Sequence, residues 1–503
     1  MKREALGRAE KWCLAATIAC GVPLIVGPIW WRCLNADVVV SVPNSKLPSP
    51  NAYDFAVAAT QQLDLASRDA VRCAIRPYKE GALLPILLPS DAPSSAMNGQ
   101  TPTQKRAYSS KEKQVMLKRN ARALQTLRKG FAFPYVQPPT RSNFYNPRFQ
   151  TDDVSYYWSS FHQLSHVLAL QAQWQKAHGD WNGALNTCLD GVHFALDIPH
   201  GAPSIGAAIG QSIETRVRAE AWPCVPHLSA SQARNALSRL QKMEKTRLPF
   251  AQTLQEEKWA LQTALVLEFR DPNWRNTLLD NRNNGSSHPE LGMRVSFISK
   301  QEIIDRVSHN LDVQIANARL PYSRQQKVFG KPDPLDESLG IVTSGDASTF
   351  FARCQAQNAL LMTTLALQAY RAEHKSYPPT LNALVPRYLP AVPLDPFADG
   401  QYLHYKLRPL RYIGDIRHTL TGRMTRNRDH FAGAPPSIPA KVPETKPHFE
   451  YSISPYTLYS IGANGTDDGG KPIENMAVTI SARDRYSTDF NQRGDLVAGI
   501  NVQ

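Results

Sequence analysis

The sequence predicts a multidomain α+β protein: an N-terminal membrane helix, a mostly α-helical middle domain, and a C-terminal long helix packed on a small antiparallel sheet. Three observations predict this fold class. Residues 12–31 carry no charged side chain, apolar residues recur at helical spacing through the middle, and one long helical pattern precedes alternating, strand-like segments near the C-terminus. A length of 503 residues also exceeds what one hydrophobic core usually accommodates. The expected regions are 1–34, 35–50, 51–330, 331–345 and 346–503.

Residues 1–34 are predicted to hold a cytoplasmic stub and the membrane helix. The run WCLAATIACGVPLIVGPIWW, at about 1.5 Å per residue, is long enough to cross a hydrocarbon layer of about 30 Å. Basic residues precede it and only Arg32 follows closely, which places the N-terminus in the cytoplasm and the bulk of the chain outside. A cleaved signal peptide is the alternative, because Pro23 and Pro28 interrupt the helix. Under either interpretation, the rest of the chain lies outside the cytoplasm.

Charge and cysteine usage narrow the classes of partner. The formal net charge is +14, but the basic residues are scattered, and no stretch interleaves a Lys/Arg stripe with aromatic residues, so no nucleic acid is expected as a partner. The chain has no CxxC pair, which argues against a zinc ribbon or a redox motif. Cys188 and Cys224 either pair in an oxidising exterior or remain isolated buried thiols.

The middle region follows an extended linker, 35–50, and is predicted to be helical from residue 51 to residue 330. Its clearest feature is a helix pair over 154–198, which turns at 178–180 and resembles one helix-turn-helix unit of tetratricopeptide repeats. His162 and His166 share a helical face there, and we interpret them as packed against the core rather than as metal ligands. No GxSxG, Walker or GxGxxG motif occurs, so nothing indicates catalysis. Further helices are expected over 111–130, 207–220, 231–245, 252–269 and 300–318.

The C-terminal region follows a second linker, 331–345. Helical spacing is kept from Asp346 to His374 and ends at the SYPP segment. A short helix, a strand near Tyr405, and alternating residues over 449–461 follow, so the long helix is expected to lie across a small antiparallel sheet. A basic insertion, 406–448, separates the strands and is predicted to be a solvated loop.

This C-terminal third resembles the globular domain of the major, G-type pseudopilins of type II secretion. The whole chain resembles large uncharacterised bacterial exported proteins that carry the same tail. The first resemblance implies a pseudopilin-like fold for 346–503. It does not imply assembly into a pseudopilus, because about 315 residues separate the apolar N-terminal run from the long helix. The residues that carry it are Ala369, Tyr370, His374, Tyr377, Pro378, Asp395, Pro396, Phe397, Tyr405, 459–465, Gly469, Gly470 and 494–497.

The same resemblance implies a calcium loop. In such pseudopilins a glycine-rich loop and a later aspartate commonly bind calcium, and the matching positions here are Asn464, Asp467, Asp468 and Asp495. Calcium takes six to eight oxygen ligands, which carboxylates and carbonyls of this loop could supply. The alternative is a plain glycine-rich turn, because Asn464 stands where the family has aspartate.

Together these observations predict a membrane-anchored extracytoplasmic binding or scaffold protein of the bacterial inner membrane, with its N-terminus in the cytoplasm. Its partners would be the membrane and other envelope proteins. Two alternatives remain: an accessory component of a type II secretion or pilus-like system, and an exported enzyme with an unrecognised site.

Overall fold

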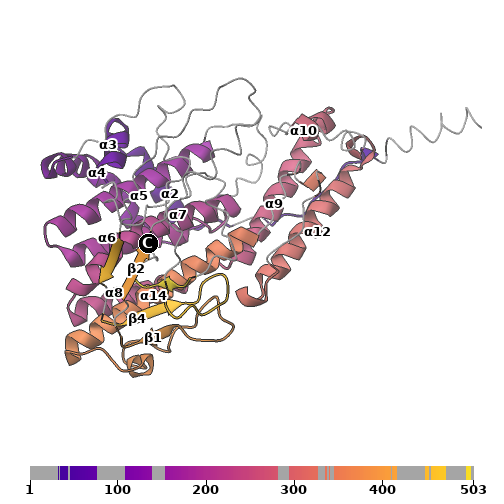
Figure 1. Ribbon diagram of the computed structural model, residues 1–503. Coiled ribbons are helices and arrows are strands. Elements are labelled where there is room, and N and C mark those ends of the chain that lie inside the picture. Colours follow the sequence, from indigo (N-terminus) through magenta and orange to yellow (C-terminus); the bar gives the residue numbers. More distant parts are fainter. Residues whose placement is uncertain are drawn as a thin grey trace, which may run out of the picture.

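The computed structural model describes residues 32, 34–43, 46–75, 108–138, 153–280, 294–326, 333, 335–336, 339, 345–408, 411–415, 448–452, 455–471 and 494–499 of the chain. This part is mostly helical (Figure 1). Its α-helices are α2 (Ala52–Gln61), α3 (Arg68–Ala74), α4 (Ser110–Gly130), α5 (Asp153–Ala177), α6 (Trp181–Asp197), α7 (Ser204–Ala221), α8 (Ala230–Glu244), α9 (Phe250–Glu268), α10 (Trp274–Asp280), α12 (Lys300–Ala318) and α14 (Gly345–His374). Short 3₁₀ turns are η1 (Leu65–Ser67), η5 (Trp222–His227), η6 (Tyr322–Arg324) and η7 (Leu381–Leu384).

The helices begin where polar side chains can satisfy their first backbone amides. Asn51 accepts a hydrogen bond from the amide of Tyr53 and so caps α2. Reciprocal capping boxes start α4, with Ser109 and Glu112, and α8, with Ser229 and Gln232. These caps explain why the helix positions expected from periodicity agree with the structure to within a few residues.

Two small sheets complete the fold. One is antiparallel with the strand order β1 (His404–Lys406), β4 (Thr457–Ser460), β5 (Leu496–Val497). Its register pairs His404 with Tyr459, and Tyr459 with Val497. The other pairs β2 (Arg411–Asp415) with β3 (His448–Ser452). The predicted basic insertion therefore includes β2, and β3 begins at its last residue, while residues 409–410 and 416–447 lie outside the described part of the chain.

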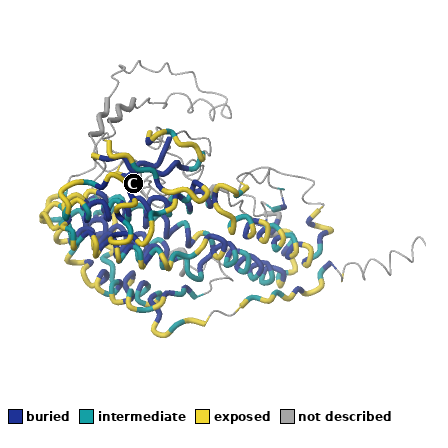
Figure 2. Tube along the Cα trace, turned by 90° about the horizontal axis from the view of Figure 1, so that it is seen from below, coloured by how far each residue is buried: buried dark blue, intermediate teal, exposed yellow. Residues whose placement is uncertain are grey.

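One hydrophobic core joins the middle of the chain to its C-terminal part. The cluster runs from Ala172 in α5 through α6, α7, α8 and α14 to Ala498 beside β5. Of the helices, α14 packs most extensively against α8, with the β1–β4–β5 sheet on another side. Its side chains are buried almost all round between Ala352 and Ala369. Figure 2 shows the same central burial along the Cα trace.

The predicted fold class is therefore wrong. The described chain is mostly helical, and α14 shares one hydrophobic core with α7 and α8 while it also contacts the β1–β4–β5 sheet. Periodicity shows which residues of α14 are apolar. It does not show that both helices and a sheet pack against them. Nor does any helix among the described residues have the length and hydrophobicity needed to span a membrane. The run 12–31, for which the membrane helix was predicted, lies outside those residues.

A helical arm projects from this body. Helices α9 and α12 pack side by side, with α10 near their far end (Figure 1), around a core cluster of their own. Both segments expected to be linkers contribute to that cluster: Val38 from 35–50, and the fully buried Leu335 from 331–345. Arg306 of α12 holds Asp336 with Nε–Oδ1 and Nη2–Oδ2 distances of 2.5 and 3.1 Å.

Because the arm has its own core, its stability should be separable from that of the body. We expect Trp274→Ala, which removes a side chain only 1% exposed, to cost about 3 to 5 kcal/mol of local stability. Hydrogen exchange followed by mass spectrometry should show faster exchange in α9 and α12 than in α6 and α14. The matched substitution Leu189→Ala in the body core should give the reverse pattern. Uniform acceleration by both variants would show that arm and body unfold together.

Candidate functional sites

The glycine-rich loop follows β4 and is shaped by backbone geometry that favours glycine. Gly462, Gly465, Gly469 and Gly470 have φ values of 73°, 67°, 78° and 87°. At Gly470 a side chain would also collide, because a Cβ atom would lie 2.9 Å from Cγ2 of Thr457. The loop thus turns tightly against its own sheet.

Three of the four predicted calcium ligands, Asn464, Asp468 and Asp495, are joined by hydrogen bonds at this loop. Asp495 is fully buried, and its two carboxylate oxygens accept hydrogen bonds from the amides of Asp468, at 3.2 Å, and Gly470, at 2.7 Å. Oδ2 of Asp468 accepts the amide of Gly494 at 2.7 Å and Nδ2 of Asn464 at 3.3 Å. The carboxylates therefore serve as acceptors that join the loop to the segment before β5.

Asp467, the fourth predicted ligand, has different neighbours. Its Oδ1 accepts the amide of Gly469 at 2.8 Å, and its Oδ2 lies 3.7 Å from Nδ1 of His404 on β1. Within the described residues, no group of three or more His, Cys, Asp or Glu side chains is arranged to hold a metal ion. The loop side chains do not fit a ready-made calcium site, because their oxygens accept backbone amides instead.

The electrostatics of Asp495 reflect its burial close to two other carboxylates. Burial, with a smaller contribution from the charges of Asp467 and Asp468, raises the pKa of Asp495 to about 6. A second buried acid, Asp395, lies beside the start of the loop. It accepts hydrogen bonds from Oγ of Ser460 at 2.7 Å and the amide of Ile461 at 2.9 Å. The loop is thus anchored by two buried aspartates.

A buried ion-pair network, formed by Glu214, Arg218, Glu244, Arg247, Gln357 and Asn358, lies at the centre of the body. The Arg218 side chain of α7 is completely buried. Its Nη1 donates to Glu214 Oε1 at 2.9 Å and to Asn358 Oδ1 at 2.8 Å, and its Nη2 donates to Oε1 of Gln357. One guanidinium therefore joins α7 to two neighbouring residues of α14.

Arg247, in the turn between α8 and α9, completes the network. Its Nη2 lies 2.6 Å from Glu214 Oε1, and its Nε lies 2.6 Å from Glu244 Oε1. Burial opposes ionisation of Glu214, but the guanidinium groups of Arg247 and Arg218 outweigh it and hold the pKa of Glu214 below its usual value. Glu214 is thus a charged, fully paired carboxylate.

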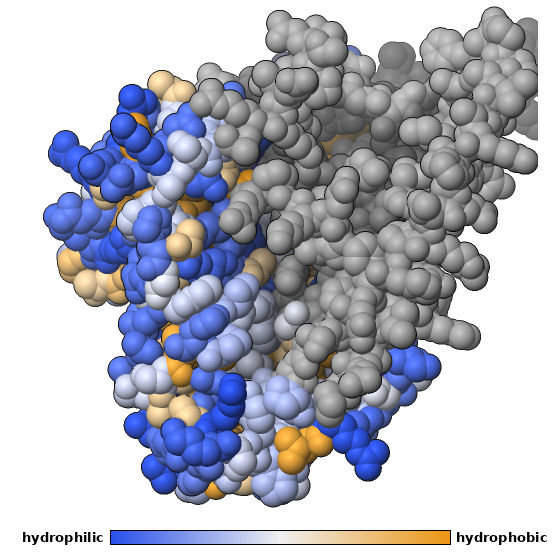
Figure 3. All heavy atoms as spheres, turned by 60° about the vertical axis from the view of Figure 1, so that its left-hand side comes forward, coloured by the Kyte–Doolittle hydropathy of each residue, from blue (hydrophilic) through white to orange (hydrophobic). Residues whose placement is uncertain are grey.

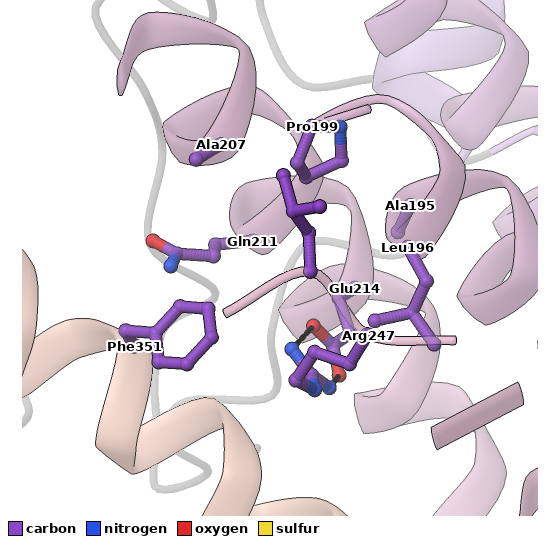
Figure 4. Close-up of a pocket in the computed structure, with 9 residues that line it drawn as sticks. Ala195, Leu196, Pro199, Ala207, Gln211, Glu214, Arg247 and Phe351 are labelled. Atoms are coloured by element: carbon purple, nitrogen blue, oxygen red, sulfur yellow. Dashed lines mark hydrogen bonds and ion pairs between the residues drawn. The ribbon is translucent and has the colours of Figure 1, made fainter. Parts of the chain in front are cut away.

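A small cleft opens beside this network (Figure 4). Its empty space, open solvent included, is about 260 Å³. The ring of Phe351 and the amide of Gln211 point toward it, while Glu214 and Arg247 face each other at one side. Both ionisable groups that line the cleft are therefore engaged with each other. The lining residues are Ala195, Leu196, Pro199, Ala207, Gln211, Glu214, Arg247, Leu248 and Phe351.

The remaining residues singled out from the sequence are structural in the described part. His162 and His166 are both buried in α5, and burial holds the pKa of His166 well below its usual value. Cys188 and Cys224 are free, buried thiols. A buried acid that is not among these residues, Glu257, accepts the amide of Ser204 at the start of α7, and burial raises its pKa to about 7.

Sequence reasoning missed the Arg218 network altogether. Its one local signal was the spacing of Glu214 and Arg218, four residues apart on a predicted helix, which is common for solvent-exposed ion pairs as well. The partners Gln357 and Asn358 lie about 140 residues further along the chain, and no pattern within either helix connects them.

The network should be important for stability. We expect Arg218→Met to lower the free energy of unfolding by about 3 to 5 kcal/mol, because the substitution leaves buried polar partners without their donor. The control is Arg234→Met, which removes a partner of Glu373 but starts from a side chain that is 42% exposed, and it should cost less than about 1 kcal/mol. Denaturant unfolding of both variants measures the difference. Equal losses would contradict a central role for Arg218.

The glycine-rich loop can be tested for calcium directly. If its hydrogen bonds alone hold it, the melting temperature in excess calcium should agree with that in chelator to within about 1 °C. Asp495→Asn should cost about 1 to 3 kcal/mol in both conditions, because one buried amide loses its acceptor. Asp305→Asn, at an exposed position of α12 outside the loop, serves as the control. A shift of several degrees that disappears in Asp495→Asn would instead establish a calcium site.

Comparison of the chain with protein-family models, with curated proteins and with solved structures gives no match. The resemblance of residues 346–503 to major pseudopilins therefore remains a prediction based on the sequence motifs alone. Any function has to be argued from the geometry described above.

Proposed function

We infer that the protein is a binding or scaffold protein of the bacterial envelope that works outside the cytoplasm. The observation that carries this proposal is the projecting arm of α9 and α12, mounted on a body whose helices are fixed to one another by buried charged groups. A rigid body with a projecting helical pair is suited to contacting other macromolecules. The location outside the cytoplasm rests on the sequence of residues 12–31, whereas the binding role rests on the arm.

The arm presents a polar outer surface of regular helical geometry. Along α12 the exposed positions include Gln301, Asp305, His309 and Val313, while Val307 and Leu311 face the arm's own core. Such a surface, held in place by a separate core, is available to a partner without rearrangement of the body. It therefore provides an accessible contact site in the described structure.

The cleft beside the network supports binding over catalysis. A catalytic centre generally brings a nucleophile or a proton-transferring group to an accessible pocket. Here the two ionisable residues that line the cleft, Glu214 and Arg247, neutralise each other. This pairing favours a structural role for them over the enzyme alternative.

An accessory role in a type II secretion or pilus-like system is the second candidate. It is favoured by the succession of α14, the β1–β4–β5 sheet and the loop held by Asp495, which is the order that the pseudopilin resemblance implies. Burial of α14 under α7 and α8 argues against filament assembly through this helix. The second candidate would therefore act beside a filament instead of within it.

Site-specific photocrosslinking in intact cells tests the proposal. A photoreactive amino acid at Asp305 or Val313 on the arm should give a discrete crosslinked product with an envelope protein. The control position is Ser238, which is exposed on α8 of the body. Crosslinks to secretion or pilus subunits would select the second candidate. Recovery of the intact protein from the cytosol, with no arm-dependent product, would refute both.

A further inference from the structure

The solvent-facing side of α4 carries an unusual row of cations. Lys111, Lys118, Arg122 and Lys129 are exposed and follow one another at intervals of seven, four and seven residues. At about 100° per residue, such positions lie within a narrow stripe of the helix surface, and they extend over about 27 Å. We call these four residues the α4 cationic row. Exposed Val115 and Gln125 fall in the same stripe.

The opposite face of α4 fixes the helix firmly to the body. Met116, Ala123, Leu124 and Leu127 are buried in a core cluster with α2 and α5. The approach to α2 is close, because a Cβ atom on Gly130 would lie 2.8 Å from Cβ of Phe55. The row is thus presented by a straight, anchored helix and cannot turn inward.

The charges of the row are not neutralised within the described structure. None of its four members forms an ion pair with a described residue. By contrast, Arg128, one turn away, bonds Asp190 at 2.6 Å, and Arg119 lies 3.5 Å from Asp64. The single acid of the helix, Glu112, is engaged at its N-terminus by the amide and hydroxyl of Ser109. Neighbouring basic residues are therefore paired while the row is left facing solvent.

We propose that the α4 cationic row is a docking surface for an anionic lipid bilayer. Lysine is depleted at protein–protein interfaces, and the row has only Val115, 43% exposed, as an apolar contact, which disfavours a folded protein partner. It contains no aromatic side chain that could stack on nucleic-acid bases. A bilayer with anionic headgroups requires neither feature, since each Lys or Arg near its surface contributes attraction independently. The side of the molecule on which α4 lies is predominantly hydrophilic among the described residues, as Figure 3 shows.

This surface is distinct from the arm proposed as the protein-binding site and does not depend on the apolar run 12–31. Insertion of an apolar segment occurs in neutral and anionic vesicles alike, whereas the row responds only to lipid charge. The difference in binding between the two kinds of vesicle therefore isolates its contribution. That difference should also fall with salt, because the Debye length shortens from about 10 Å at about 0.1 M to about 3 Å at about 1 M.

The test is co-sedimentation of the full-length chain with phosphatidylglycerol-containing vesicles and with pure phosphatidylcholine vesicles. Reversal of two members, Lys118→Glu with Arg122→Glu, should lower the anionic-over-neutral partition ratio by at least about 30-fold. The control pair, Lys242→Glu with Arg270→Glu, changes the net charge equally at exposed positions of other elements and should leave the ratio within about threefold. The neutral pair Lys118→Gln with Arg122→Gln provides a second test, and circular dichroism verifies the fold of each variant.

Two results would overturn the proposal. One is an equal loss of anionic binding in the row variants and the control pair, which would show that only net charge matters. The other is loss of binding to duplex DNA in the row variants with vesicle binding unchanged, which would assign the row to nucleic acid instead.

Discussion

The described body depends on one buried guanidinium, that of Arg218. A fully desolvated cation is tolerated only where acceptors face it, and here they are Glu214 of α7 itself and Gln357 and Asn358 of α14. Helix α8 joins the network because Glu244 accepts a hydrogen bond from Nδ2 of Asn358. Each acceptor is in turn placed by the helix that carries it, so the network fixes the positions of these helices relative to one another more closely than apolar contacts would. The small residues of α14, including Ala352, Ala356 and Ala359, allow the close approach that these hydrogen bonds need.

In the C-terminal segment, buried charged groups with several hydrogen-bond partners likewise fix the position of a loop. Asp395 and Asp495 are buried carboxylates whose acceptor oxygens are taken by backbone amides and a serine hydroxyl, so each joins chain segments that are distant in sequence. Between them they position the glycine-rich loop against β4. The same geometry explains why this loop has the aspartates and glycines of a calcium loop. Glycine adopts the positive φ values of the turn without strain, and aspartate accepts hydrogen bonds from the backbone amides.

Local structure was largely predictable, and its assembly was not. Periodicity and caps predicted the α5–α6 pair, α4, α12 and α14, since these signals reside in contiguous residues. Helix α14 was predicted as a helix but only with a sheet as its neighbour, whereas it also packs against α7 and α8. Its apolar residues occupy most of the helix circumference, and a single sequence does not reveal whether helices or strands cover each side. Similarly, Val38 and Leu335 looked like isolated apolar residues in linkers, although they complete the core of the arm. At the candidate sites, the sequence identified the carboxylates near the loop but not their amide partners.

The central position of α14 has implications for biosynthesis. The helices that surround it, α7 and α8, leave the ribosome more than a hundred residues before it, and until α14 is made, Glu214 and Arg218 have neither Gln357 nor Asn358 as neighbours. The nascent body would then hold these charged side chains without their α14 partners. Folding of the body cannot be completed until α14 packs against α7 and α8. Contacts of such long sequence separation should make folding slow, and the incomplete chain should be exposed to proteases or dependent on a chaperone.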